Sequence, residues 1–346
     1  MQQPLYKKIL FDLQAAIQSG KIPVGSQLPT EKELSETYQV SRITSKRALT
    51  ELEQAGLIYR VRGKGSFVKS PDKQMRNPKK ATRILFLLPF VNDLSVGNFA
   101  EGLSPVMQKN QTEMMMTTLE FLGQKTASEI MNEFDGLIYY ALDTDQYLDL
   151  LFEFSLKNFP VVVLDKKIFE LSFPTVLSAN LEGSALATRS LIEEGHQKIA
   201  YLFGNQKHPQ SVRQRYLGYL NALNQEKLPF HTLLDDELAT NATLLEYIEK
   251  HQVTAFVCEN DLVAIQAMKQ LKEHNYQIPE DFSIIGFDDI QAASLVEPPL
   301  TTIAQNFAKL GEVAGKLLID WIENNQIPED IKIPVDLIQR KSTKEK

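Results

Sequence analysis

The 346-residue sequence has little of the chemistry that marks secreted, membrane-bound or metal-clustered proteins. It contains one cysteine, Cys258, which excludes an internal disulfide framework and a CxxC metal pair. Its longest apolar run, ILFLLPFV, is far shorter than the roughly 20 residues that span a bilayer. The first residues also lack the apolar core of a signal peptide. We therefore expect a cytoplasmic protein that has no membrane partner.

Catalytic and metal-binding patterns are missing as well. The five histidines show no HExxH or other ligand spacing, and the sequence has no Walker loop, GxGxxG or GxSxG. His196 follows a glycine at an expected helix end, and Cys258 lies in an apolar strand where a thiol is inert. We expect no catalytic residue, no metal site and no cofactor, so an enzyme is not predicted.

Charge is unevenly distributed along the chain. Residues 1–80 hold 15 of the 37 Lys and Arg residues but only 7 of the 44 Asp and Glu residues, so this segment is strongly basic and the remainder is acidic. This asymmetry predicts that only the N-terminal segment meets a polyanion. A charged surface that is simply solvated would give the same count, so charge alone does not distinguish it from a polyanion-binding surface.

The basic segment shows a helix-turn-helix pattern followed by a hairpin. Residues 4–20 repeat an apolar residue every fourth position and predict an amphipathic helix. Thr30 and Glu33 have the spacing of a capping box at the start of a short second helix. Ser41 is placed to cap a third helix, which stops at a glycine. Residues 57–68 alternate in polarity around Gly-Lys-Gly and predict a two-stranded wing.

These residues resemble the winged helix-turn-helix of the GntR family. The resemblance covers the run from Leu28 to Val68, and the family pattern S-R-x-T-V-R-x-A-L stands here as SRITSKRAL at residues 41–49. Ser45 takes the place of an apolar residue, and Lys46 takes the place of an arginine that can fork to a guanine. The resemblance implies that the partner of this domain is double-stranded operator DNA.

The same resemblance implies which residues contact DNA. Recognition-helix residues would face the major groove, the second helix would meet phosphates, and the hairpin tip would lie over the minor groove or the backbone. The implied residues are Ser41, Arg42, Thr44, Ser45, Lys46 and Arg47 in the recognition helix, Thr30, Glu31 and Lys32 at the second helix, and Lys64 at the tip. Alternatives stay open, because Arg42 or Arg47 could instead form a surface salt bridge, for instance with Glu51, and Glu31 could only cap.

Beyond a polar, basic linker at residues 70–82, short apolar strands alternate with helical segments. The strands read from the sequence are RILFLLPF, TEMMMTTLE, DGLIYYA, PVVVLD, KIAYLFG, TAFVCEN and SIIGFDD. Continuous apolar strands between helices predict an α/β fold of parallel sheets that are covered on both faces. We therefore expect a DNA-binding domain over 1–69 and a two-lobed α/β domain over 83–343.

Polar residues follow several of these strands, where ligands bind in open parallel sheets. They are Asp165, Asn260 with Asp261, and Asp288 with Asp289. Carboxylates and amides that converge on a cleft suit a neutral polyhydroxylated ligand. Each residue also has a structural alternative, since Asp261 could cap the next helix and Asp289 could hold a turn.

The second part of the chain resembles the LacI/GalR effector domain. The matching segments are NLEGSALATRSLIEEGH (180–196), RYLGY (215–219), IPEDFSIIGFDD (278–289), PPLTTI (298–303) and LIQRKS (337–342). The resemblance implies a type I periplasmic-binding-protein-like domain of two parallel-sheet lobes, between which the chain crosses three times. Lobe 1 would comprise about 83–178 and 305–325, and lobe 2 about 179–304 and 326–343.

Ligand-binding residues are also implied by this resemblance. Arg215, Asn260 and Asp288 match positions that hydrogen-bond sugar hydroxyls in that family, Asp165 falls near a fourth, and Gln305 lies at a lobe crossover. The first lobe departs from the family, because relatives have N-P-F-F where this chain has residues 96–102. Phe99 in this stretch could stack on a sugar face or pack in the core.

A GntR-type head joined to a LacI-type body resembles the arabinose-repressor-type regulators. It predicts a homodimeric repressor that reads a two-fold operator and is released from DNA by a small-molecule effector, a sugar. Two alternatives remain: a cytoplasmic sugar-binding protein without DNA regulation, and a regulator that senses a nucleobase or a sugar phosphate.

Overall fold

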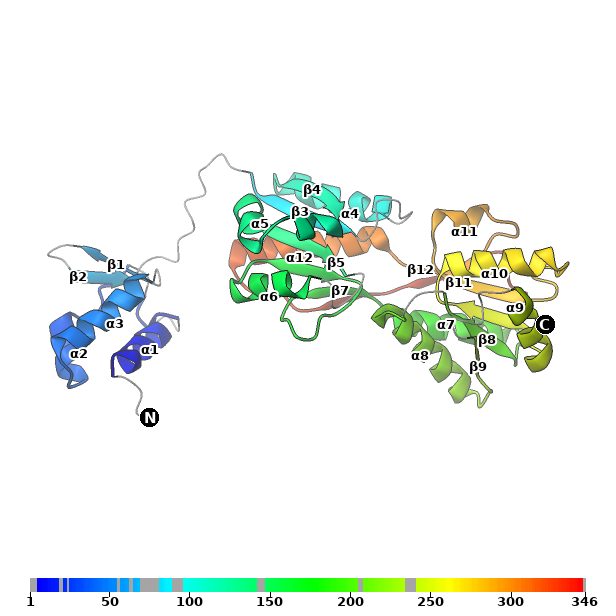
Figure 1. The fold of residues 1–346 in the computed structure, drawn as a ribbon, viewed down its shortest axis with the longest axis horizontal. Coiled ribbons are helices and arrows are strands. Elements are labelled where there is room, and N and C mark those ends of the chain that lie inside the picture. Colours follow the sequence, from blue (N-terminus) through cyan, green and yellow to red (C-terminus); the bar gives the residue numbers. More distant parts are fainter. Residues whose placement is uncertain are drawn as a thin grey trace. The chain divides into compact units, whose positions relative to one another are not determined.

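The computed structural model describes the chain over residues 5–18, 21–23, 25–54, 57–61, 65–68, 81–88, 96–141, 147–204, 208–233 and 241–344. It divides into two compact units, Met1–Lys80 and Ala81–Lys346, called here the head and the body (Figure 1). The expected linker lies outside the described residues except for its last two positions.

The head contains three helices and a hairpin. They are α1 (Leu5–Gln18), α2 (Glu31–Thr37), α3 (Arg42–Gln54), and the antiparallel strands β1 (Ile58–Val61) and β2 (Gly65–Val68). The capping box at α2 is confirmed: Glu33 N–H donates to Thr30 Oγ1, and the Glu33 carboxylate accepts from Thr30 N–H at 2.7 Å. A small apolar core that includes Ile9, Leu34 and Leu49 holds the helices together.

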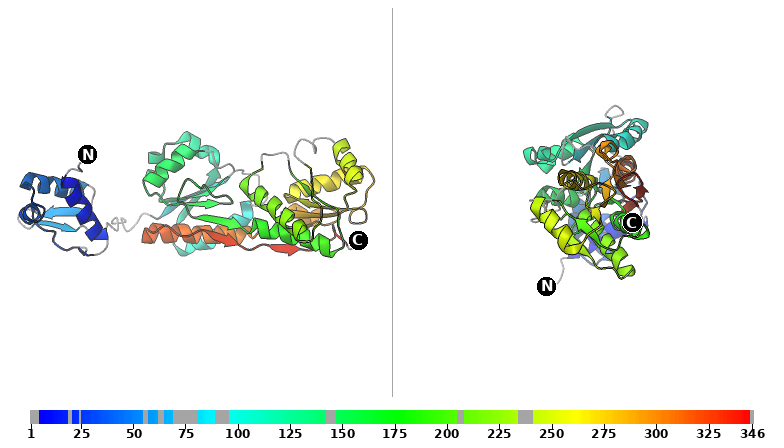
Figure 2. Two further views of the ribbon diagram at one scale, coloured as in Figure 1. Left: turned by 90° about the horizontal axis from the view of Figure 1, so that it is seen from below. Right: turned by 90° about the vertical axis from the view of Figure 1, so that its right-hand side faces the viewer.

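The body consists of two lobes, each built on a six-stranded sheet. In lobe 1 all neighbouring strands are parallel, in the order β13-β7-β6-β5-β3-β4. These strands are β3 (Arg83–Leu88), β4 (Glu113–Thr118), β5 (Gly136–Tyr140), β6 (Val161–Leu164), β7 (Thr175–Ser178) and β13 (Ile331–Ile333). The helical elements of lobe 1 are α4 (Val96–Lys109), η1 (Leu119–Gln124), α5 (Ala127–Glu133), α6 (Leu148–Leu156) and α12 (Phe307–Asn324). Figure 2 shows α12, in orange and red, lying along lobe 1, where it packs against α4.

Lobe 2 has the strand order β14-β12-β11-β10-β8-β9, with only β14 antiparallel to its neighbour. Its strands are β8 (Ile199–Leu202), β9 (His231–Leu233), β10 (Ala255–Cys258), β11 (Ser283–Asp288), β12 (Thr301–Ala304) and β14 (Asp336–Ile338). Its helices are α7 (Asn180–Glu193), α8 (Gln210–Gln225), α9 (Asn241–His251), α10 (Asp261–Glu273) and α11 (Gln291–Leu295). Apolar clusters lie on both faces of each sheet, as buried parallel strands require.

The chain crosses between the lobes three times, after β7, after β12 and after β13. The third crossing corrects the lobe boundary expected from the sequence. Strand β13 pairs with β7, so residues 331–333 belong to lobe 1 and lobe 2 resumes only at β14. The sequence analysis did not identify β7, β9, β12, β13 and β14, because each of these strands has only three or four residues, of which at least one is polar.

None of the described helices is both long enough and apolar enough to cross a membrane.

Candidate functional site

The start of α3 presents an exposed polar face. Thr44 N–H donates to Ser41 Oγ at 3.3 Å, so Ser41 caps the helix as expected. Arg42 and Lys46 are exposed, and Thr44 is half-buried. Sequence reasoning missed Ile43, which is 81% exposed beside them. An exposed β-branched side chain at a recognition helix suits contact with a thymine methyl group.

Ser45 corrects an expectation from the sequence. The residue is fully buried, and its hydroxyl has no hydrogen-bond partner among the described residues. It therefore faces the core of the head and presents no surface to a base edge. The signal for this was in the pattern itself, because the GntR family has an apolar residue at this position.

Arg47 adopts the salt bridge that the sequence analysis kept as an alternative. Its Nε lies 3.3 Å from Glu51 Oε1, and its guanidinium lies 4.0 Å above the ring of Tyr6 on α1. By contrast, Arg42 forms no ion pair within the described part of the chain. Of the two arginines, Arg42 is therefore the less constrained candidate for a base contact.

The second helix and the wing are tied together by Arg60. Its guanidinium pairs with Glu53 at 3.2 Å and with Glu31 at 3.7 Å, so Glu31 is engaged within the head. Thr30 is engaged in its cap, while Lys32 is exposed and lies 3.9 Å from Glu36. The Lys64 prediction lies outside the described residues.

In the body, Arg215 is the centre of a polar network. Nε donates to Asn180 Oδ1 at 2.8 Å, Nη1 donates to the Glu259 carbonyl at 2.6 Å, and Nη2 lies 3.1 Å from Asp288 Oδ1. The guanidinium also lies 3.8 Å from the centre of the Phe287 ring. Each of the three guanidinium nitrogens thus has a polar neighbour, and these neighbours come from several elements.

The helix that carries Arg215 is held unusually close to its neighbour. A Cβ at Gly218 would lie 2.1 Å from the Leu181 carbonyl of α7, so only glycine permits this packing. Close packing of α8 on α7 brings Arg215 within reach of Asn180 at the start of α7. Burial alone would lower the pKa of the Arg215 guanidinium, but the carboxylates of Asp288 and Asp165 outweigh it and raise that pKa, so the group stays charged.

Asp288 joins Arg215 to the second crossover. Gln305 Nε2 donates to Asp288 Oδ1 at 2.6 Å, and Gln305 is the residue that follows β12 where the chain leaves lobe 2. The Asp288 side chain is 21% exposed, so a ligand hydroxyl can reach it. The structure therefore brings together three of the predicted residues, Arg215, Asp288 and Gln305.

On lobe 1, Asp165 follows β6 and pairs with Lys166, a residue that sequence reasoning missed. Lys166 is buried, and its Nζ lies 2.5 Å from Asp165 Oδ2 and 2.6 Å from the Ala141 carbonyl. From the other lobe, Ser211 Oγ donates to Asp165 Oδ2 at 3.2 Å. The only sequence signal for Lys166 was a charged residue directly after a buried strand.

Asn260 takes the capping role that was considered for Asp261, and Asp261 lies in the interior of lobe 2. Asn260, not Asp261, caps α10, because its Oδ1 accepts from Val263 N–H at 2.9 Å. Asp261 is fully buried and accepts from Ile290 N–H at 2.9 Å and from the Thr302 hydroxyl at 2.5 Å. Burial, followed by the nearby Asp288 charge, raises the pKa of Asp261 to about 7.

Phe99 packs in the core of lobe 1, which was the alternative to sugar stacking. Its ring makes edge contacts with Phe86, Tyr140 and Phe307 at centroid distances of 6.0, 5.7 and 5.1 Å. It also lines a small cavity together with Asp165 and Gln305. Its contribution to a site is therefore a rigid apolar wall rather than an exposed platform.

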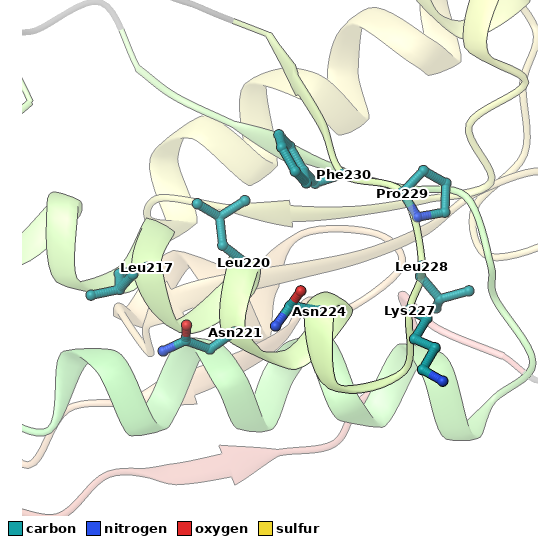
Figure 3. A pocket seen from close by; sticks show the side chains of 8 residues that line it. All are labelled: Leu217, Leu220, Asn221, Asn224, Lys227, Leu228, Pro229 and Phe230. Carbon is teal, nitrogen blue, oxygen red and sulfur yellow. The ribbon is translucent and has the colours of Figure 1, made fainter.

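A larger hollow of about 680 Å³ lies elsewhere on lobe 2. Figure 3 shows it between Leu217, Leu220 and Asn224 of α8 and the segment that ends in Phe230. None of the predicted ligand-binding residues lines it. Within the described residues no group of three or more His, Cys, Asp or Glu side chains could hold a metal ion.

Comparison with known protein families assigns both parts of the chain. Residues 5–68 match the family described as "Bacterial regulatory proteins, gntR family". Residues 188–343 match the family described as "Periplasmic binding protein-like domain". Both resemblances drawn from the sequence are confirmed.

Curated relatives are named as repressors. The chain is 28% identical over 361 residues to the arabinose metabolism transcriptional repressor of Geobacillus stearothermophilus, covering 99% of this chain and 98% of the relative. It is 31% identical over 244 residues to the HTH-type transcriptional repressor PurR of Mannheimia succiniciproducens, covering 68% of this chain and 70% of the relative.

Solved structures share the fold of the body. A LacI family transcriptional regulator from Enterococcus faecium with bound ribose has a TM-score of 0.66 and 26% identity, covering 76% of this chain and 99% of that one. A CelR–cellobiose complex has a TM-score of 0.66 at 20% identity, covering 91% of this chain and 100% of that one, which supports the fold alone.

Proposed function

Because this chain belongs to the ligand-controlled transcriptional repressors that join a GntR-family head to a periplasmic-binding-protein-like body, we propose that its effector is a small neutral sugar held between the two lobes. The observation that carries this proposal is the Arg215–Asp288–Gln305 network, which presents fixed donors and acceptors at the lobe crossover. A sugar hydroxyl needs one donor and one acceptor, and paired groups of this kind supply both.

Charge compensation favours a neutral ligand over a sugar phosphate. Arg215 is balanced by Asp288, and Lys166 is balanced by Asp165. A phosphate would compete with these carboxylates for their cations and would leave them buried without partners. A neutral polyol can bond to both pairs without separating either of them.

For the head, we propose that Arg42, Lys46 and Thr44 read the operator, with Ile43 as an apolar contact. These residues lie at one helix start within the stretch that matches the recognition-helix pattern, and Arg42, Ile43 and Lys46 are exposed there while Thr44 is half-buried. Lys32 and the start of α2 would meet phosphates, where a positive side chain adds salt-dependent affinity without sequence preference.

We further propose a cytoplasmic homodimer, without catalytic activity, that pairs through lobe 2. Leu262 on α10 is 62% exposed and Leu295 on α11 is 75% exposed, although both helices pack on the same core cluster. Exposed leucines on neighbouring helices suit contact with a second copy, which would pair two heads for a two-fold operator. Leu295→Glu should halve the mass measured by analytical ultracentrifugation, and an unchanged mass would exclude this face.

The experiment that tests the function combines DNA binding with a ligand screen. Gel shifts with DNA from upstream of the gene, at stated salt, should give a specific complex that neutral sugars release and sugar phosphates and nucleobases do not. Operator DNA must change sugar affinity by the same factor, because the coupling is reciprocal. Failure to form a specific complex at any salt would favour a sugar-binding protein without DNA regulation.

A further inference from the structure

A second cavity adjoins the effector cleft at the edge where the lobes meet. Its volume is about 250 Å³. Lobe 1 contributes Phe169 from the segment after β6 and Leu177 and Ser178 from the end of β7, and lobe 2 contributes Leu181 of α7 and Gln214 of α8. Since both lobes supply walls, a ligand here would be sensitive to the angle between them.

This cavity shares residues with the effector cleft. Asp165 and Ser178 line both this cavity and the small cavity that contains Gln305 and Phe99. Asp165 is also the residue to which Ser211 of lobe 2 donates. A ligand in the outer cavity would therefore lie next to the Gln305 side.

Ser178 marks the junction between the two cavities. The residue is 5% exposed, and its Oγ has no hydrogen-bond partner in the described part of the chain. A buried hydroxyl without a partner is unfavourable and points to a group that is supplied by something else. A ligand hydroxyl or bridging oxygen at this point would satisfy it.

The cavity has three apolar side chains in its lining, and its charged residues are paired. Phe169 is 74% exposed, and Leu177 and Leu181 line the same cavity. The two lysines nearby are compensated, since Lys167 pairs with Asp330 and Lys332 pairs with Glu182. The lining therefore combines three apolar side chains with the amides of Asn180, Gln210 and Gln214. Apolar walls with neutral donors and acceptors suit the C–H face and hydroxyl edge of a sugar ring and give no advantage to an anion.

We propose that the effector is a disaccharide or a comparable glycoside. One ring lies against Arg215, Asp288 and Gln305, the other lies in the outer cavity that Phe169 lines, and Ser178 bonds to the ligand between them. This inference rests on the proposed sugar-responsive function. It makes Phe169 and Ser178 residues that determine effector size.

The test compares matched sugars on the full-length protein by isothermal titration calorimetry. The pairs are D-xylose with xylobiose, L-arabinose with arabinobiose, and D-glucose with cellobiose and maltose. We expect one disaccharide to bind at least about tenfold more tightly than its constituent monosaccharide, as a second set of ring contacts requires. A monosaccharide that binds as tightly as every disaccharide would overturn this inference and leave the proposed function intact. No binding by any sugar would overturn the proposed function itself.

Two variants separate the outer cavity from the cleft. Phe169→Ala should weaken the disaccharide about three- to tenfold and leave the monosaccharide unchanged. Ser178→Ala should act in the same direction without lowering the melting temperature of the free protein, because its hydroxyl bonds to nothing there. Phe230→Ala, which removes another exposed phenylalanine from a different cavity (Figure 3), should change neither affinity. An equal loss for both sugars in Phe169→Ala would contradict the assignment.

Discussion

The recognition helix of the head and the cleft of the body place their functional side chains in opposite environments. Arg42, Ile43 and Lys46 are exposed and make few contacts within the protein. Arg215 is buried, and its guanidinium is fixed by four neighbours. DNA is a large polyanion that docks on a surface, whereas a small ligand needs an enclosed and preorganised site. Substitutions of these exposed residues in the head should therefore change binding alone, while substitutions in the Arg215 network should change binding and stability together.

The largest effect is expected for Asp288→Ala. It removes the partner of both Arg215 and Gln305, and charged hydrogen bonds of this kind contribute about 1.5–3 kcal/mol. Effector affinity should fall by roughly 100-fold while operator binding persists without a response, as measured by calorimetry and gel shift. Asp288→Asn is the control for shape, and a normal ligand response in the alanine variant would remove Asp288 from the site.

The next largest effect is expected for Arg42→Ala, which tests the exposed residues of the recognition helix. Loss of a bidentate base contact costs about 1–3 kcal/mol, so operator affinity should drop about tenfold or more. Arg47→Ala should cost less, because Glu51 and Tyr6 already hold that side chain. Neither variant should alter the thermal shift produced by the effector.

The matched control for Arg42→Ala is Lys269→Ala, which deletes a positive charge from an exposed position on α10. It should leave operator binding unchanged. If an arginine variant lost both operator binding and effector stabilisation, the cause would be misfolding rather than lost readout.

A smaller effect is predicted for Ser45→Ala. Ser45 lies on the recognition helix but is buried, as Arg215 is in the body. Deleting a buried, unpaired hydroxyl should raise the stability of the head by about 1 kcal/mol and leave operator affinity unchanged. Thr44→Ala is the comparison, because that hydroxyl lies 2.9 Å from Ser41 Oγ. A clear loss of operator affinity in Ser45→Ala would restore it to the DNA-binding surface.

The last prediction is a pH dependence of stability in the body. The pKa of Asp261 is raised from its ordinary value of 3.8 to about 7 in the folded protein. Between these pH values the Asp261 carboxyl is ionised in the unfolded chain and protonated in the folded one. The folded state then binds more protons, and stability falls as pH rises through this window, by at most about 1.4 kcal/mol per pH unit. Asp261→Asn should flatten the profile of melting temperature between pH 5 and 7, and an unchanged slope would contradict the assignment.

Much of the head was readable because its signals are local. The capping box at Thr30 and the cap at Ser41 depend on residues three positions apart, and the wing depends on alternation within twelve residues. The error at Ser45 arose because the packing of α3 against α1 and α2 decides whether this side chain faces the core or the solvent.

In the body, the sequence by itself determined the alternation of strands and helices and the polar residues at strand ends, since both follow from local hydrophobic pattern. Only the tertiary structure decided that Arg215 meets Asp288, that Lys166 neutralises Asp165 and that Ser178 is left without a partner. Arg215 and Asp288 lie far apart in the chain, and Lys166, although it follows Asp165 directly, is also held by the carbonyl of the distant Ala141. Their geometry is set by close packing of whole elements, such as α8 on α7 at Gly218, which no local pattern encodes.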